Sequence, residues 1–210
     1  MKTNRQITAS IITVVAIAGV LLQLGLTLQH AAVSVPTTLL RFFSYFTIST
    51  NLLVILYFGN LAVNNGLSKS FLNKAESAAA ITTYIVVVGL IYQLILSKLY
   101  KPEGLNLLAD NIIHGFTPVV TFIFWIVYES DKKVRMNTIG YWCLYPFLYL
   151  VYTLVKGAMT GFYPYPFVDV MKYGMQQVLI NNFFIMLLFL LLFFSFGWIA
   201  NFRSTSKLKA

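Results

Sequence analysis

Charge is scarce in this chain. Only 10% of its 210 residues are charged, whereas a typical soluble domain has about 25%. Acidic residues are the scarcest, with 6 Asp and Glu against 15 Lys and Arg, and the net charge is +9. Because the basic residues lie almost entirely between apolar runs, they are typical of topology signals and lipid-headgroup contacts. The composition excludes a soluble domain and predicts no nucleic-acid partner.

Side chains that bind metals are nearly absent as well. Cys143 is the one cysteine, which excludes an internal disulfide framework and a cysteine-based metal site. The two histidines, His30 and His114, come without a close pair of carboxylates, so a metal centre would be short of ligands. A haem held by both would need His30, in a connection, to join His114, in an apolar segment. We therefore expect no metal and no cofactor.

Long apolar runs are what the chain has in abundance. It is 59% hydrophobic and 16% aromatic, with a mean hydropathy of +0.77. Crossing about 30 Å of hydrocarbon takes about 20 residues, and six stretches are long enough, near residues 7–28, 40–61, 77–96, 107–127, 139–155 and 178–199. Backbone groups in lipid must bond within their own segment, which favours helices. The sequence predicts an all-α integral membrane bundle of six transmembrane helices, forming a single domain over residues 1–210.

The first apolar run could be misread as a secretory signal, because Lys2 and Arg5 precede it. It is about 20 residues long, whereas the apolar core of a signal has about 7–15, and no convincing Ala-x-Ala site follows it. We therefore expect a retained helix. The two halves of the chain show no repeat, so the inverted symmetry common in secondary transporters is not evident.

Lysine and arginine are divided unequally between the two sides of the expected bundle. Ten lie on the side of the termini: Lys2, Arg5, Lys69, Lys74, Lys132, Lys133, Arg135, Arg203, Lys207 and Lys209. Five lie on the other side: Arg41, Lys98, Lys101, Lys156 and Lys172. By the positive-inside rule, the richer side faces the cytoplasm. We expect both termini to be cytoplasmic in a multi-pass protein, located in the cell membrane if the source is bacterial.

Polar side chains within the apolar segments gather toward the outer side. Thr47 and His114 each lie about seven residues into a segment that enters from that side, roughly 10 Å below the boundary. Four further polar residues fall in the same layer: Gln23, Gln93, Asn181 and Asn182. Polar groups at membrane depth are costly and mark functional sites. A layer of them, with almost none in the inner half, indicates the floor of a pocket.

The first polar cluster is Thr47, Thr50 and Asn51, which share one helical face at spacings of i, i+3 and i+4. Simpler roles exist for its members. A membrane threonine such as Thr50 commonly bonds its own i−4 carbonyl, and Asn51 could bond an adjacent helix.

The second polar cluster is Asp110, Asn111 and His114, which share another helical face. Pro118 removes the amide that would bond the His114 carbonyl, so we expect a kink beside the histidine. Here too a simpler interpretation stands open, with His114 as a hydrogen-bonding group within the bundle and Asp110 as an interfacial residue.

Together the clusters contain the parts of a nucleophilic site. A hydroxyl is a weak nucleophile until a base removes its proton, and imidazole suits that role near neutral pH. Thr47 matches the depth of His114, and Asp110, one turn earlier, would orient the ring. Four amides are candidate donors to an oxyanion: Asn51, Asn111, Asn181 and Asn182. The substrate would be an ester reached from the outer leaflet, which indicates a lipid.

Three stretches resemble a known family. The sequences RFFSYFTISTNLLVILYFG (41–59), DNIIHGFTPVV (110–120) and KGAMTGFYPYPFVDV (156–170) are similar to the androgen-induced protein/ADTRP family, and most of all to its bacterial six-helix relatives. The YPYPF loop is the most specific of them. The resemblance implies a multi-pass membrane hydrolase that cleaves fatty-acid esters of hydroxy fatty acids. It places the threonine nucleophile on Thr47 and the histidine on His114, although Ser49 and Thr50 stand close enough to compete.

Two functions therefore remain as hypotheses. The first is an intramembrane lipid-ester hydrolase with Thr47 as nucleophile, His114 as base, and a supporting pocket that includes Gln93. The second is a lipid- or small-solute-binding membrane protein, or a transporter, that uses the same outer-leaflet pocket. Both have membrane lipids as partners, and both leave the oligomeric state open. The distance from the Thr47 hydroxyl to the His114 ring separates them.

Overall fold

The computed structural model describes residues 3–64 and 70–207, and these residues form helices and no strand. In chain order the α-helices are α1 (Asn4–Gln29), α2 (Val35–Phe42), α3 (Phe46–Asn64), α4 (Ala75–Leu94), α5 (Gly104–Asn111), α6 (Thr117–Tyr128), α7 (Ile139–Thr160) and α8 (Val170–Lys207). Short helical segments join them: η1 (Phe71–Asn73), η2 (Leu96–Lys98), η3 (Ile112–Phe116), η4 (Met136–Thr138) and η5 (Pro166–Val168).

Six helical spans among the described residues are long and apolar enough to cross a membrane. They are Asn4–Gln29, Phe46–Asn64, Ala75–Lys98, Gly104–Tyr128, Met136–Thr160 and Val170–Ser206. The all-α, multi-pass membrane architecture expected from the sequence is thus confirmed.

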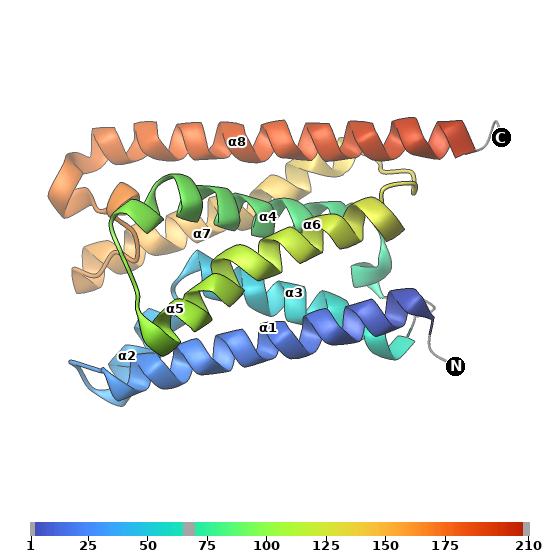
Figure 1. Ribbon diagram of the computed structural model, residues 1–210. Coiled ribbons are helices and arrows are strands. Elements are labelled where there is room, and N and C mark those ends of the chain that lie inside the picture. The colour runs from blue at the N-terminus through green and yellow to red at the C-terminus, as the bar shows by residue number, and fades with distance from the viewer. Residues whose placement is uncertain (1–2, 65–69, 208–210) are drawn as a thin grey trace.

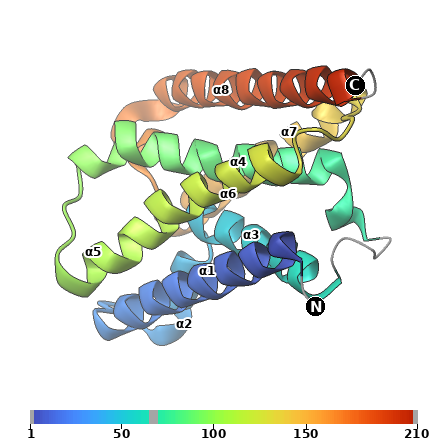
Figure 2. The ribbon, with the colours of Figure 1, turned by 45° about the vertical axis from the view of Figure 1, so that its right-hand side comes forward.

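The helices form a bundle with α4 at its centre. Helix α4 packs on α3, α6 and α8, and it is the most buried of the six spans. Helix α1 lies along α3 and also contacts α5 and α6. In both ribbon views α8 and α1 lie on opposite sides of the bundle, with the α5–α6 span crossing between α1 and α4 (Figures 1 and 2).

Both ends of the described chain lie at the same end of the bundle (Figure 1). Ion pairs of Glu129 with Arg5 and Lys132, and of Glu76 with Arg135, lie at this end. Three of the basic residues that predict cytoplasmic termini, Lys2, Lys69 and Lys209, lie outside the described residues. The cytoplasmic side assigned to this end stays a prediction.

The expected continuous helix over residues 40–61 is broken in the structure. Helix α2 ends at Phe42 and α3 begins at Phe46. In the break the Ser44 hydroxyl donates to the Arg41 carbonyl at 2.6 Å, and the Tyr149 hydroxyl donates to the Ser44 carbonyl at 2.8 Å. The same Tyr149 oxygen accepts the Phe46 amide at 3.1 Å. A side chain from α7 thus stabilises the start of α3, and Thr47 is the second residue of its helix.

The irregularity expected near Pro118 is a π-helical turn, η3, between α5 and α6. The Thr117 amide donates to the Ile112 carbonyl, five residues earlier. In that register the next acceptor is the Ile113 carbonyl, which Pro118 cannot bond because it has no N–H. The side-chain amide of Asn51 donates to this carbonyl instead, at 3.2 Å. We expected Pro118 to leave the His114 carbonyl without its amide partner. In the structure, the carbonyl that a side chain bonds is that of Ile113.

The last two spans are longer than the expected ranges 139–155 and 178–199. Helix α7 ends where Gly161 adopts a left-handed conformation with φ +68°, which glycine adopts without steric cost. Helix α8 starts at Val170, and Gly174, whose φ +75° and ψ 157° are non-helical, interrupts its first turns. The loop between them, 161–169, contains the YPYPF motif and folds over the end of the bundle opposite the chain termini (Figure 1).

Candidate active site

The structure brings Thr47, His114 and Asp110 into one chain of hydrogen bonds. The Thr47 hydroxyl lies 3.3 Å from Nε2 of His114, and Nδ1 of His114 lies 2.9 Å from the Asp110 carboxylate. All three side chains are largely buried. The order hydroxyl, imidazole, carboxylate is that of a nucleophile, its base and the group that orients the base.

The local backbone explains how Thr47 of α3 meets Asp110 and His114 of the α5–η3 segment. Asp110 is in the last turn of α5 and His114 is in the π turn, so the i,i+4 pair spans the irregularity. Asn51 bridges α3 and this segment, because its side-chain amide donates to the carbonyls of Thr47, at 2.8 Å, and Ile113. Tyr92 of α4 stacks on the imidazole, with ring centroids 4.0 Å apart and planes 8° from parallel. The ring of His114 is thus fixed at one edge and on one face.

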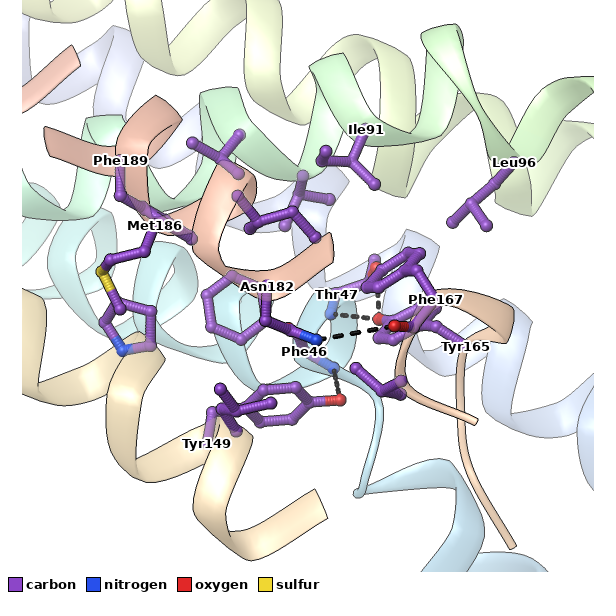
Figure 3. Close-up of a pocket in the computed structure, with 16 residues that line it drawn as sticks. Phe46, Thr47, Ile91, Leu96, Tyr149, Tyr165, Phe167, Asn182, Met186 and Phe189 are labelled. Atoms are coloured by element: carbon purple, nitrogen blue, oxygen red, sulfur yellow. Dashed lines mark hydrogen bonds between the residues drawn. The ribbon is translucent and has the colours of Figure 1, made fainter. Parts of the chain in front are cut away.

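Tyr165 of the YPYPF loop also contacts Thr47. Its hydroxyl accepts the Thr47 amide at 3.1 Å and lies 3.2 Å from the Thr47 hydroxyl (Figure 3). The ring is buried between Phe167, stacked at 5.1 Å, and the edge of Tyr45, at 5.5 Å. Burial raises the pKa of the Tyr165 hydroxyl to about 12. At neutral pH the phenol therefore keeps its proton.

A cavity of about 400 Å³ opens onto this group. Thr47, Asp110, His114, Tyr92 and Tyr165 all line it, and the rest of its wall is mostly apolar. The remaining lining residues are Gln23, Thr27, Phe42, Tyr45, Ile48, Leu96, Leu99, Tyr100, Ile113, Pro164 and Pro166. The volume lies within the range of about 300–1,000 Å³ that is usual for small-molecule sites.

A second, smaller cavity of about 70 Å³ adjoins Thr47 on another side (Figure 3). Its walls come from α3, α4, α7 and α8 and include Phe46, Asn182, Met186 and Phe189. Thr47 and Tyr165 line both cavities. Thr47 therefore lies where two mostly apolar spaces meet.

Ser49 and Thr50, the competing hydroxyls, point elsewhere. Both bond the Tyr145 hydroxyl of α7, Ser49 at 2.8 Å and Thr50 at 3.2 Å. Among the hydroxyls that the structure describes, Thr47 is the one in contact with His114. The geometry thus separates three neighbouring hydroxyls that spacing alone left equivalent.

The four amides expected as oxyanion donors lie in different environments, and Asn182 lines the smaller cavity at Thr47. Both bonds from the Asn51 amide go to backbone carbonyls, and Asn111 is exposed on α5. The amides of Asn181 and Asn182 donate to the Phe167 carbonyl at 3.4 and 3.5 Å. These two asparagines therefore support the loop that carries Tyr165. The role of the four amides as oxyanion donors stays a prediction, because helical spacing does not show which bonds an amide has already made.

Gln93 lies apart from the Thr47 cavity. It lines a third space of about 310 Å³ on the far side of His114, next to Pro118 and Leu192. His30 bonds the Leu26 carbonyl at 2.9 Å at the end of α1. Among the described residues, no three His, Cys, Asp or Glu side chains are grouped closely enough to hold a metal ion.

Sequence reasoning gave no role to Tyr92, Tyr149 and Tyr165, although each touches the site or the start of α3. Only Tyr165 had a signal, because it lies in the distinctive YPYPF loop.

Compared with known protein families, curated proteins and solved structures, the chain matches none.

Proposed function

We propose that this protein is an intramembrane lipid-ester hydrolase in which Thr47 is the nucleophile and His114 the general base. The observation that carries the proposal is the bond chain itself, with 3.3 Å from Thr47 to His114 and 2.9 Å from His114 to Asp110. A base must lie within hydrogen-bond reach of the proton that it removes. At 3.3 Å, the distance from the Thr47 hydroxyl to Nε2 of His114 is slightly longer than the usual range of about 2.6–3.2 Å.

The direction of proton transfer follows from Asp110. An ionised carboxylate only accepts hydrogen bonds, so the ring nitrogen beside it, Nδ1, carries the proton. Nε2 then presents its lone pair to the Thr47 hydroxyl. As the hydroxyl attacks an ester carbonyl, its proton passes to Nε2, and Asp110 stabilises the imidazolium that forms.

The surroundings favour a lipid ester as substrate. The Thr47 cavity is mostly apolar and lies among membrane-spanning helices, where an acyl chain is a natural occupant. The second cavity at Thr47 offers separate space for the other part of an ester. The resemblance of residues 41–59, 110–120 and 156–170 to the androgen-induced protein/ADTRP family adds fatty-acid esters of hydroxy fatty acids as the first substrates to test.

A binding protein or transporter would use the same cavity without chemistry. Transport needs a path to the other end of the bundle, where Glu129 is paired with Arg5. The helix segments leading there are filled by Phe58, Phe124 and Trp125, all nearly inaccessible. Phe58 and Phe124 contact each other at 4.8 Å across α3 and α6. This packing favours a site that opens at one end.

The test is ester turnover by the purified full-length protein. A fatty-acid ester of a hydroxy fatty acid should be hydrolysed, and Thr47→Ala and His114→Ala should each lower kcat by at least about 10³-fold. Thr50→Ala is the matched control, since it removes a neighbouring buried hydroxyl that bonds Tyr145 and not His114. It should retain turnover within about threefold.

Two results would contradict the proposal. Turnover in Thr47→Ala at the wild-type rate would exclude Thr47 as nucleophile. Stoichiometric binding of the intact ester without any hydrolysis would favour the binding function.

A further inference from the structure

Two tyrosine hydroxyls accept the first two backbone amides of α3, and they differ in the second bond that each of them makes. Tyr149 accepts the Phe46 amide and Tyr165 accepts the Thr47 amide, each at 3.1 Å (Figure 3). Tyr149 gives its own proton to the Ser44 carbonyl at 2.8 Å. Tyr165 shares a bond with the Thr47 hydroxyl at 3.2 Å, and either oxygen can be the donor. The proton of Tyr149 is committed to the backbone, whereas the hydroxyl of Tyr165 is free to donate to the proposed nucleophile.

An ester hydrolase needs a donor at this place. The carbonyl oxygen of a bound ester lies one carbon atom from the attacking hydroxyl and becomes negatively charged on attack. A donor already in contact with that hydroxyl can reach the new oxyanion. The amides of Asn51, Asn181 and Asn182 are bonded to carbonyls. Tyr165 also lines the Thr47 cavity, where the ester would lie.

We propose that the Tyr165 hydroxyl donates the hydrogen bond that stabilises the oxyanion of the tetrahedral intermediate. This inference rests on the proposed hydrolase function and assigns it a third catalytic residue. The Thr47 amide, bonded to the phenol oxygen, polarises the O–H bond toward the oxyanion.

The step balances without further reactants. The Thr47 oxygen bonds to the carbonyl carbon while its proton moves to His114, and the carbonyl π pair becomes a lone pair on oxygen. Tyr165 donates a hydrogen bond to that oxygen and keeps its proton. The ester C–O bond then breaks, and the departing alcohol takes the proton from His114. A water molecule repeats the sequence on the acyl-threonine and releases the acid.

The position of Tyr165 is set before any substrate arrives. Its ring is held between Phe167 and Tyr45, and the Phe167 carbonyl accepts the amides of Asn181 and Asn182. A donor fixed in advance stabilises charge without reorganisation during the reaction. The YPYPF loop therefore contributes a catalytic group as well as a cover for the cavity.

The experiment compares Tyr165→Phe with Tyr149→Phe in the full-length protein. The readouts are kcat for the ester, the rate of covalent labelling by an alkyl fluorophosphonate, and the thermal midpoint. The phosphoryl oxygen of the probe would occupy the oxyanion position. Tyr165→Phe should lower kcat and the labelling rate by about 10²-fold, with a small change in KM. Tyr149→Phe should lower both rates by less than tenfold, because it removes two backbone bonds at the start of α3 and no bond to the Thr47 hydroxyl.

Equal thermal midpoints for the two variants would assign the difference to chemistry and not to folding. The proposal for Tyr165 fails by itself if the wild type is labelled at Thr47 and Tyr165→Phe is labelled equally fast. If Tyr165→Phe and Tyr149→Phe lose activity in parallel with their thermal midpoints, Tyr165 is structural. A wild type that is neither labelled nor active would overturn the hydrolase function, and the role of Tyr165 with it.

Discussion

Asp110 decides, at the scale of single residues, what His114 can do. Its carboxylate lies 2.9 Å from Nδ1 at the edge of the ring, and Tyr92 stacks on the face of the ring. A carboxylate in this place fixes which ring nitrogen bears the proton. Removing its charge while preserving its shape therefore tests the proton relay separately from packing.

Asp110→Asn should reduce ester turnover by about 10²–10⁴-fold, because an amide can donate to Nδ1 and leave the proton on Nε2, facing Thr47. The measurement is kcat together with the thermal midpoint. Asn111→Ala, one residue further and exposed, is the control and should match the wild type. An Asp110→Asn variant with full activity would exclude the relay.

The residue pattern predicted part of this arrangement. Asp110 and His114 share a helical face by spacing, and the structure places them in contact. Thr47 was matched to His114 by depth and by the family resemblance, and neither shows whether the two helices touch. The YPYPF motif singled out the loop that contains Tyr165, but the contact of Tyr165 with Thr47 was beyond sequence reasoning. That contact depends on how a loop over 100 residues away folds back on α3.

At the scale of elements, the site depends on close packing of α4 against the π turn. Gly89 of α4 faces Pro118, and a Cβ built on Gly89 would lie 2.9 Å from Cβ of Pro118 and 3.4 Å from the His114 carbonyl oxygen. A side chain here must push the two spans apart. Gly59 of α3 has no such constraint, since its nearest neighbour, Cγ2 of Thr13, would lie at 3.8 Å.

Gly89→Ala should therefore destabilise the protein by about 1–3 kcal/mol and lower kcat, because His114 moves with the π turn. Gly59→Ala should be neutral or stabilising, since alanine is favoured over glycine within helices by about 1 kcal/mol. Thermal unfolding in detergent and ester turnover measure both effects. Equal midpoints for the two variants would show that α4 and α6 adjust freely.

Hydropathy predicted the six spans but not the break between α2 and α3 or the π-helical turn between α5 and α6. The π turn had a signal in Pro118, which removes a backbone donor. The break between α2 and α3 had none, because no glycine or proline occurs in residues 43–45. Tyr149, more than 100 residues away, stabilises it by bonding both Ser44 and Phe46. Boundaries set by tertiary contacts are not local properties of the sequence.

The whole molecule has two unlike ends. One carries the Thr47 cavity and the YPYPF loop. The other carries the two ends of the described chain and the ion pairs of Glu76 and Glu129. Because the described basic residues are more numerous at the second end, the positive-inside rule predicts that the cavity faces the outer leaflet. The orientation is testable because Cys143, the one cysteine, can be replaced.

In a Cys143→Ser background, Lys101→Cys should react with a membrane-impermeant maleimide in intact cells. Lys133→Cys, at the opposite end, should react only after the cells are permeabilised. Both side chains are exposed, so access to the reagent decides the result. The reverse pattern would turn the cavity toward the cytoplasm and leave the geometry of the site unchanged.

The central claim is that Thr47 is a nucleophile, and the most direct measurement is to locate a covalent adduct. The full-length protein is treated with an alkyl fluorophosphonate, digested and mapped by mass spectrometry. We expect a single phosphonylated residue, Thr47, and loss of the adduct in His114→Ala. An adduct on Ser49 or Thr50, or none in a protein that hydrolyses the ester, would contradict the account.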